Sequence, residues 1–325
     1  MNINREIDYE SANAKLQDVL FKVEKEPVYV ELIPIESTLF NHSTPEKILI
    51  NEYNAIVNKS NNDILSVVSR NYNLITNQKA LELGKEAFTK LFNVNADMKV
   101  YKVITSSRKT FCHIDLIHEN VNLKVWEQDA WFPFIRVTNS YNRTYALAFE
   151  LGFVRKLCLN GVIFNKKTIK VKYSHTGNID LFQINADISQ LESAKADFIN
   201  HMLNLKRFYI NESLYFPLLC KVLDIKKPIK NENDFSYEPR QKMYNDLNAQ
   251  TISLTSEYIK QEGSNAYAFF NVITDLVSHQ DEYKSIAGFN LNPTKYFLKP
   301  AIWVEEFVEK AEKRDFKIEE YINVL

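Results

Sequence analysis

Glycine is scarce in this sequence, which has only six in 325 residues: Gly84, Gly152, Gly161, Gly177, Gly263 and Gly288. Loops that cradle phosphate need clustered glycines, because the backbone must approach the ligand closely. No two of the six have the spacing of a P-loop or of a dinucleotide-binding fingerprint. ATP-driven and NAD-dependent chemistry on the common nucleotide-binding folds is therefore not expected, and we predict no cofactor.

Cysteine and histidine are also too few and too scattered to suggest a metal or nucleophilic site. Cys112, Cys158 and Cys220 lie far apart and form no CxxC pair, so we expect buried thiols in a reducing compartment. His113 and His118 are five residues apart on a predicted strand, which places them on opposite faces. The acidic residues of the central segment are dispersed, so no catalytic residue is assigned and the protein is predicted not to be an enzyme.

Long apolar runs are missing as well. The most apolar stretch, Leu214 to Cys220, is seven residues long and contains Pro217, whereas a membrane span needs about 20 apolar residues. The first eight residues carry charges where a signal peptide would be apolar. We therefore expect a cytoplasmic protein without membrane contact.

The sequence does contain the composition of a packed globular protein, with 45% hydrophobic and 25% charged residues and a net charge of −1. Periodicity predicts a helix over 6–25 that Pro27 ends, a strand over 28–34, a loop over 35–62, a strand over 64–70 and a helix over 78–92 capped by Asn77. Strands follow over 99–105, 110–117, 121–126, 134–138, 145–151, near 157 and over 168–173. Helices are expected over 188–205, 212–223, 239–261, 264–279 and 300–322.

This order predicts an α+β fold, in which an antiparallel sheet region with flanking helices is followed by a mainly helical C-terminal region. We expect a sheet domain over 1–180 and a helical region over 181–325, with a linker near 226–239. Within the helix over 188–205, helical spacing predicts that Phe198 and Met202 are buried.

Positive charge is concentrated in the sheet region. Residues 99–177 hold thirteen Lys and Arg but five Asp and Glu, a surplus of +8 that the rest of the chain balances. Between Gly152 and Gly177 there are six bases, no acid and three interleaved aromatic residues. Cations and aromatic rings on one sheet face are typical of surfaces that bind a phosphodiester backbone and stack bases. Solvated lysines that protect a strand edge, or a surface for a protein partner, are the alternatives.

A polar string, Thr138 to Arg143, falls between two predicted strands and should form an exposed hairpin tip. Its Asn, Ser, Tyr and Arg side chains can bond phosphate or a base edge. An ordinary Asn-rich turn explains the same composition.

Five pieces of sequence carry a resemblance to a known family. They are residues 66–77 (SVVSRNYNLITN), 134–143 (FIRVTNSYNR), 155–161 (RKLCLNG), 173–179 (YSHTGNI), and 263–275 (GSNAYAFFNVITD) together with His279. In this order the chain resembles the phage/plasmid-like family DUF932, whose function is unassigned. The family usually has a glycine in the turn after the Asn, where this chain has Ser140 to Arg143. The resemblance implies a protein of a mobile element in a bacterial host, with a role in DNA metabolism or in conflict with the host.

These observations together predict a nucleic-acid-binding protein of a mobile element, of a kind that handles single-stranded DNA in recombination or replication. The rivals are a counter-defence protein that inhibits a host enzyme or immune complex, and an enzyme with a hidden site around Asn139, Asn160, His175 and Asn271. Self-association into a homo-oligomer is a further possibility. The predicted nucleic-acid contacts are Arg136, Asn139, Tyr141, Arg143, Arg155, Lys156, Asn160, Lys166, Lys167, Lys170, Lys172 and His175.

Overall fold

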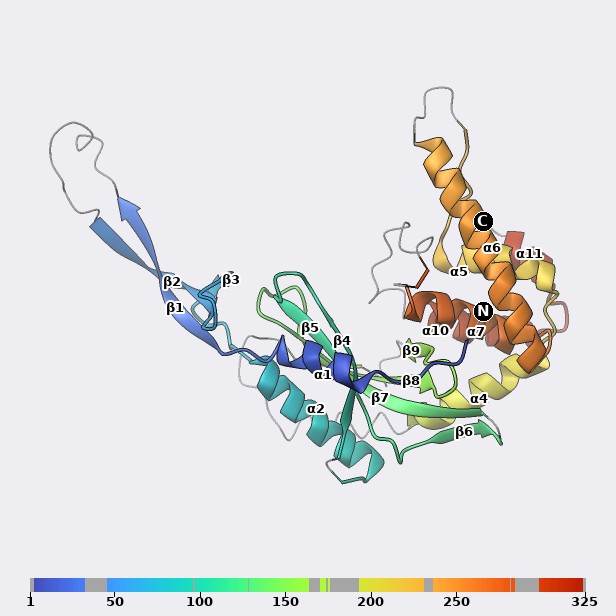
Figure 1. Ribbon diagram of the computed structural model, residues 1–325, viewed down its shortest axis with the longest axis horizontal. Helices are drawn as coiled ribbons and strands as arrows, with labels where there is room; N and C mark the ends of the chain where they lie inside the picture. The colour runs from blue at the N-terminus through green and yellow to red at the C-terminus, as the bar shows by residue number, and fades with distance from the viewer. Residues whose placement is uncertain are drawn as a thin grey trace.

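The computed structural model describes residues 3–32, 46–95, 97–127, 129–163, 170–173, 175, 193–230, 236–280, 282–283 and 298–323. Figure 1 shows a narrow β-arm at one end, a central sheet, and a helical region at the other end. Both termini lie beside the helical region, because the N-terminal segment runs from the helices to the sheet. This architecture confirms the predicted α+β fold.

The arm consists of β1 (Val23–Leu32) and β2 (Glu46–Asn58), which pair antiparallel; β3 (Ile64–Ser69) joins β2 at the base of the arm. Two predictions were wrong here. The helix expected over 6–25 is the shorter α1 (Tyr9–Gln17), and Pro27 lies inside a strand. A proline is compatible with β1 because this strand is at the edge of its sheet and has a bulge between Pro27 and Val28.

β2 is the element that the sequence analysis missed, since its residues were assigned to a loop. The composition of 35–62 is rich in Asn and Ser, which usually indicates turns. These residues nevertheless form a strand, because their apolar side chains pair with those of β1. The register of that pairing joins residues that are distant in the sequence, so no local pattern predicts it.

The central sheet has seven strands in the order β10-β8-β7-β5-β4, with β6 beside β7 and β9 beside β8. All of its pairs are antiparallel. The strands are β4 (Lys99–Thr105), β5 (Phe111–Ile117), β6 (Leu123–Trp126), β7 (Asp129–Ser140), β8 (Leu147–Arg155), β9 (Gly161–Ile163) and β10 (Lys170–Tyr173). The predicted strands agree with these bounds closely, except that β7 and β8 extend further and that the strand expected near 157 is a turn, with β9 beginning four residues later at Gly161.

Helix α2 (Asn77–Phe92) packs on one face of this sheet. Its N-cap is Thr76, whose hydroxyl accepts a hydrogen bond from the Lys79 amide at 3.1 Å; Asn77, the predicted cap, lies one residue inside. Gly84 allows the close approach, because a Cβ there would lie 2.2 Å from Cγ2 of Val137.

The helical region is built around α7 (Ala266–Ser278), which is buried along its whole length. Around it lie α4 (Ser193–Arg207), the 3-10 turn η3 (Glu212–Leu214), α5 (Tyr215–Leu223), α6 (Tyr237–Glu262), α10 (Lys299–Ala311) and α11 (Ile318–Asn323). Phe198 and Met202 of α4 are buried as predicted. The helix expected over 300–322 is divided into α10 and α11, and the start expected near 188 lies outside the described residues. Among the helices that the structure describes, none has the length and apolar character that a membrane crossing requires.

Candidate functional site

A row of charges of alternating sign crosses the central sheet. The strand register places Lys102 of β4 opposite Asp115 of β5, Asp115 opposite Arg136 of β7, Arg136 opposite Glu150 of β8, and Glu150 opposite Lys170 of β10. Directly opposed charges of opposite sign stabilise a sheet, whereas like charges destabilise it. We call these five residues the charge ladder. The cation at its centre, Arg136, is neutralised by an acid 21 residues away in the sequence, Asp115.

The centre of the ladder is fully enclosed. Arg136 donates from Nε and Nη2 to the two carboxylate oxygens of Asp115, both at 2.7 Å. Arg136 is 0% exposed and Asp115 1%. Burial opposes the charge, yet the carboxylates of Asp115 and Glu150 raise the pKa of Arg136. The prediction that Arg136 contacts nucleic acid was therefore wrong, because its guanidinium group is buried and bound to Asp115.

A cluster of polar residues lies where the central sheet meets the base of the arm. Asn139 donates from Nδ2 to Oδ1 of Asn77 at 2.8 Å and to the Ile75 carbonyl at 2.9 Å. The Tyr141 hydroxyl accepts from the Asn77 amide at 2.9 Å, and the Tyr72 hydroxyl donates to the Ser140 carbonyl at 2.9 Å. We call this group the arm-side cluster. It fastens the start of α2 to the end of β7.

His175 belongs to the same cluster. Its ring stacks on Tyr72, with centroids 5.0 Å apart, and its backbone carbonyl accepts from the Asn73 amide at 2.7 Å. Burial lowers the pKa of His175, so the ring is neutral near pH 7 and carries no charge for a phosphate.

A second cluster lies at the other end of β7 and β8, against α6 and α7. Arg155 donates from Nε to Asp129 at 2.6 Å, from Nη1 to Oδ1 of Asn271 at 3.2 Å, and from Nη2 to Glu262. The Tyr267 hydroxyl also donates to Asp129. We call this group, with Asn160 and Asp275 described next, the helix-side cluster. Its hydrogen bonds connect the sheet to the helical region.

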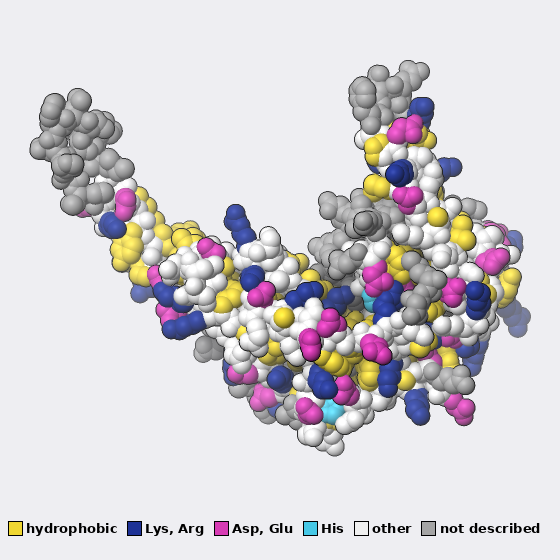
Figure 2. Space-filling view, in the orientation of Figure 1, with side chains coloured by type: hydrophobic (Ala, Val, Ile, Leu, Met, Phe, Trp, Pro, Cys, Tyr) yellow, Lys and Arg dark blue, Asp and Glu magenta, His cyan; other side chains and the backbone are white. Residues whose placement is uncertain are grey.

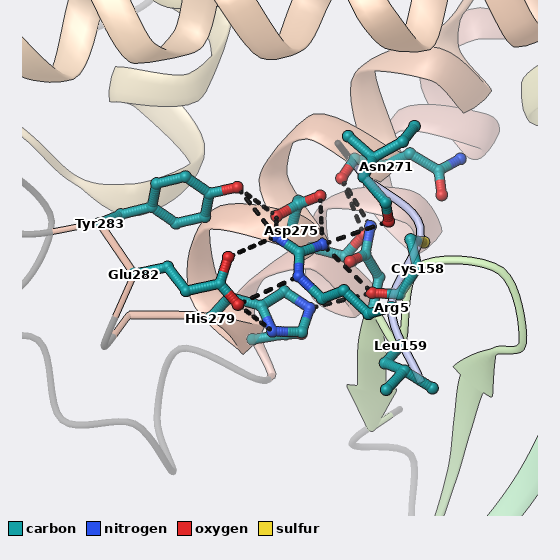
Figure 3. A network of polar contacts seen from close by, with 12 residues as sticks. Arg5, Cys158, Leu159, Asn271, Asp275, His279, Glu282 and Tyr283 are labelled. Atoms are coloured by element: carbon teal, nitrogen blue, oxygen red, sulfur yellow. Dashed lines mark hydrogen bonds and ion pairs between the residues drawn. The ribbon is translucent and has the colours of Figure 1, made fainter. Parts of the chain in front are cut away.

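Asp275 of α7 is the most enclosed acid of the helix-side cluster, with a side chain that is 0% exposed. The hydroxyls of Tyr258 and Tyr283 donate to it at 2.5 and 2.7 Å, and Arg5 contacts both of its oxygens (Figure 3). Asn160 donates to the Tyr258 hydroxyl at 2.8 Å and to the Asn271 carbonyl at 3.1 Å. The carboxylate thus accepts hydrogen bonds from three neighbouring residues, Arg5, Tyr258 and Tyr283.

Cys158 and His279 lie beside Asp275 but are not arranged for nucleophilic catalysis. Burial raises the pKa of the Cys158 thiol, which keeps it protonated. Burial and the Arg5 charge lower the pKa of His279 to about 4. His279 Nε2 lies 3.0 Å from the Cys158 carbonyl oxygen rather than from the sulfur (Figure 3). The His279 imidazole is therefore neutral and hydrogen-bonds to the backbone, and the nearby Cys158 thiol is neutral as well.

A polar cleft of about 610 Å³ opens over the helix-side cluster, with Asp129, Arg155, Glu262, Lys206 and Trp126 among its lining residues. Lys206 donates to Glu262 at 2.9 Å and lies 4.0 Å from the centre of the Trp126 ring. Asp129 and Glu262 therefore pair with Arg155 and Lys206 in this cleft, which Glu127 also lines. Across the described residues, no group of three His, Cys, Asp or Glu side chains could hold a metal ion.

The twelve predicted contacts fall into three groups. Six are buried and are corrected here as residues of the protein interior: Arg136, Asn139, Tyr141, Arg155, Asn160 and His175. Arg143 and Lys156 are exposed. Lys166 and Lys167 lie outside the described residues, as do the side chains of Lys170 and Lys172, whose backbone forms edge strand β10.

The position of the matching motifs at adjacent strand ends predicts that Asn139, Tyr141 and Arg143 lie near Arg155, Asn160, Lys172 and His175. This prediction is wrong for Arg155 and Asn160, whereas His175 lies in the same cluster as Asn139 and Tyr141. Arg155 pairs with Trp131 on β7, whereas Ala148 pairs with Thr138 at the opposite end of the same two strands. Seven residues of strand separate Trp131 from Thr138, which is about 23 Å. The tip at Tyr141 and His175 therefore belongs to one end of the sheet, and Arg155 with Asn160 to the other.

Sequence reasoning did not find Asp129, Asp275, Tyr258 and Tyr267 as members of a site. Asp129 and Asp275 are isolated acids on apolar segments, and a lone acid inside an otherwise apolar helix is a signal for a buried, paired charge. That signal was present in 266–278, where Asp275 is the single charged residue.

The family comparison can now be set beside this geometry. The model of the family described as "Domain of unknown function (DUF932)" matches residues 64–296, and the chain belongs to this family. No curated protein and no solved structure matches the chain.

The five resembling pieces meet in the two buried clusters. Residues 66–77 and 134–143, with His175 of the piece 173–179, supply the arm-side cluster, whereas 155–161 and 263–275 supply the helix-side cluster. Side-chain hydrogen bonds join separate pieces in both clusters, Asn139 with Asn77 in the first and Arg155 with Asn271 in the second. The five pieces therefore supply contacts that join the central sheet to the base of the arm and to the helical region.

Proposed function

We propose that this chain binds nucleic acid, with single-stranded DNA of a mobile element as the substrate class, through cations on two neighbouring hairpin tips. The observation that carries the proposal is the position of Arg108, Lys109 and Arg143. Arg108 and Arg143 are exposed and Lys109 is half-exposed at the tips that join β4 to β5 and β7 to β8.

The two tips are held together by hydrogen bonds. The Tyr141 amide donates to the Thr110 carbonyl at 2.7 Å, and Asn142 Nδ2 donates to the Thr110 hydroxyl at 3.2 Å. Lys109 and Arg143 both have left-handed backbone, with φ of 55° and 63°, as is usual in tight turns. A phosphodiester backbone would meet cations on a rigid support, which reduces the entropy lost on binding.

The charge surplus of residues 99–177 supports the same proposal. Three of its bases pair with three of its acids, through Lys99 with Glu119, Arg136 with Asp115, and Arg155 with Asp129. Removing equal numbers of both signs leaves the surplus of +8 unchanged. Two acids outside the segment also pair with its bases, Asp18 with Lys109 at 3.6 Å and Glu262 with Arg155. The positive field that would attract a polyanion therefore rests on exposed cations such as Arg108 and Arg143.

The first prediction is that Arg143→Ala weakens binding of a labelled single-stranded oligonucleotide and lowers the slope of log K against log salt by roughly 0.7, the loss of one phosphate contact. Fluorescence anisotropy at several salt concentrations measures both. Lys124→Ala is the matched control: Lys124 is an exposed cation of the same segment on β6, beside Ala130 at the far end of the sheet.

A slope that falls equally in both variants would mean that binding follows overall charge and not this site. Unchanged affinity in Arg143→Ala, with an intact melt, would overturn the proposed site. If nucleic acid does not bind at low salt and a host protein co-purifies, the counter-defence role replaces this proposal.

A second candidate function is self-association through the arm, and a specific observation favours it. The register places Val28, Val30 and Leu32 on one face of the arm with Ile48 and Ile50, and Glu46 at the end of this face pairs with Leu32. Val30, Leu32 and Ile48 are 43–48% exposed, and Figure 2 shows hydrophobic side chains along the arm. The other face carries Tyr29, Leu49 and an ion pair of Lys47 with Glu31 at 3.2 Å. We propose that the apolar face packs on the same face of a second copy of this chain.

Two features indicate a second copy. The arm extends away from the rest of the molecule (Figure 1), so two arms can meet without the bodies colliding. The same apolar face on each partner is what an isologous contact requires. One face of a short hairpin offers less than the 1,200 Å² or so of a stable interface, so the association is expected to be weak.

The second prediction is therefore a molar mass that rises with concentration up to about 100 μM, the range expected for a small interface. Light scattering after size exclusion measures it. The double variant Val30→Glu/Ile48→Glu stays monomeric, whereas the control Tyr29→Glu/Leu49→Glu, with the same charge change on the opposite face, still associates. A monomeric wild type, or identical behaviour of the two doubles, contradicts the arm contact.

A further inference from the structure

Arg5 lies in a site that surrounds its guanidinium group on several sides. Nη1 and Nη2 donate to the two oxygens of Asp275 at 3.2 and 3.0 Å, and Nε and Nη2 donate to the two oxygens of Glu282 at 3.1 and 2.8 Å. Nη2 also donates to the Tyr283 hydroxyl at 3.1 Å, and Nη1 to the carbonyls of Cys158 at 3.3 Å and Ile3 at 3.5 Å. Figure 3 shows these groups around the Arg5 side chain.

This geometry is specific for a guanidinium. Two carboxylates bind it bidentately along two edges, which a planar fork of five N–H donors can satisfy and a compact ammonium cannot. The Asp275 side chain is 0% exposed and that of Glu282 is 53% exposed, so the site is closed at one end and open to solvent at the other. Arg5 itself is 13% exposed.

The site and its occupant belong to different parts of the chain. Cys158, Asp275, Glu282 and Tyr283 all fall within residues 64–296, which match the family, whereas Arg5 precedes that region. Arg5 reaches the site on an irregular segment before α1, held by a hydrogen bond from its amide to the Leu157 carbonyl at 3.1 Å. Without this segment, Asp275 and Glu282 would lack the cation that now lies between them.

We propose that the family region of this chain contains a guanidinium-binding site, which Arg5 fills as an internal ligand, and that the site accepts the side chain of an arginine from a peptide as a replacement. The proposal is independent of nucleic-acid binding, because the site is negative and lies at the opposite end of β7 and β8 from the hairpin tips. An arginine-bearing partner would compete with the N-terminal segment for it.

The test uses the full-length Arg5→Ala variant, with methylguanidinium chloride as the probe and methylammonium chloride as the control cation. The variant is expected to melt about 5–10 °C below the wild type, because a buried acid loses its partner. Methylguanidinium at about 20 mM should raise that melting temperature by a few degrees with a saturating dependence, as mass action requires. The wild type, whose site is filled, should not respond.

Two further variants make the result specific. Arg5→Ala/Asp275→Asn should show no response to methylguanidinium, and Arg5→Lys should melt between Arg5→Ala and the wild type. If Arg5→Ala does not fold, its recovery of soluble protein from urea is compared with each cation present, and recovery with methylguanidinium alone supports the site. Equal effects of the two cations, or a variant as stable as the wild type, would overturn the proposal.

Discussion

Replacing Arg136 with methionine is expected to lower the free energy of unfolding by about 3–5 kcal/mol, as for other buried ion pairs that lose one partner. Arg136 is 0% exposed and binds Asp115 at 2.7 Å through two donors. Methionine keeps much of the volume but leaves Asp115 and Glu150, on the strands either side of β7, buried without the cation between them. Urea unfolding followed by circular dichroism measures the loss.

The control is Arg240→Met on the exposed start of α6, where the change should be within about 0.5 kcal/mol. The double variant Arg136→Met/Asp115→Leu should recover part of the loss, because it removes one of the two uncompensated acids. A single variant as stable as the wild type would show that the charge ladder is open to water, and would return Arg136 to the candidate surface cations.

Truncating Phe198 to alanine is expected to cost about 3–5 kcal/mol, the range for large core aromatics. Phe198 is 1% exposed. Its ring stacks on Phe153 with centroids 4.0 Å apart and meets Trp131 edge-on at 5.1 Å. The variant removes the contact between α4 and strands β7 and β8, and its urea midpoint should fall without a change in slope.

Leu203→Ala is the matched control on the same helix, because Leu203 is 37% exposed and loses little buried area. A loss below about 1 kcal/mol for Phe198→Ala would mean that α4 does not pack on the sheet in solution. A large loss for both variants would instead indicate that Leu203 is covered by another molecule.

Local pattern alone determined much of this fold. The strand over 99–105 and the helix over 78–92 were predicted almost to the residue, because alternation and helical spacing are properties of neighbouring residues. The burial of Phe198 followed from the same spacing. The family assignment also came from sequence, since the five pieces occur in order along the chain.

The tertiary structure decided which polar residues are available. Arg136 and Arg155 have the composition of a nucleic-acid surface, yet their acids lie 21 and 26 residues away and meet them only across the sheet. The partner of Arg5 is 270 residues distant. Net charge along a segment is fixed by sequence, but the pairing of each charge depends on strand register and helix packing, which no local pattern specifies. For this reason the sequence alone predicted the surplus of cations, and only the fold separated those that face solvent from those that hold the protein together.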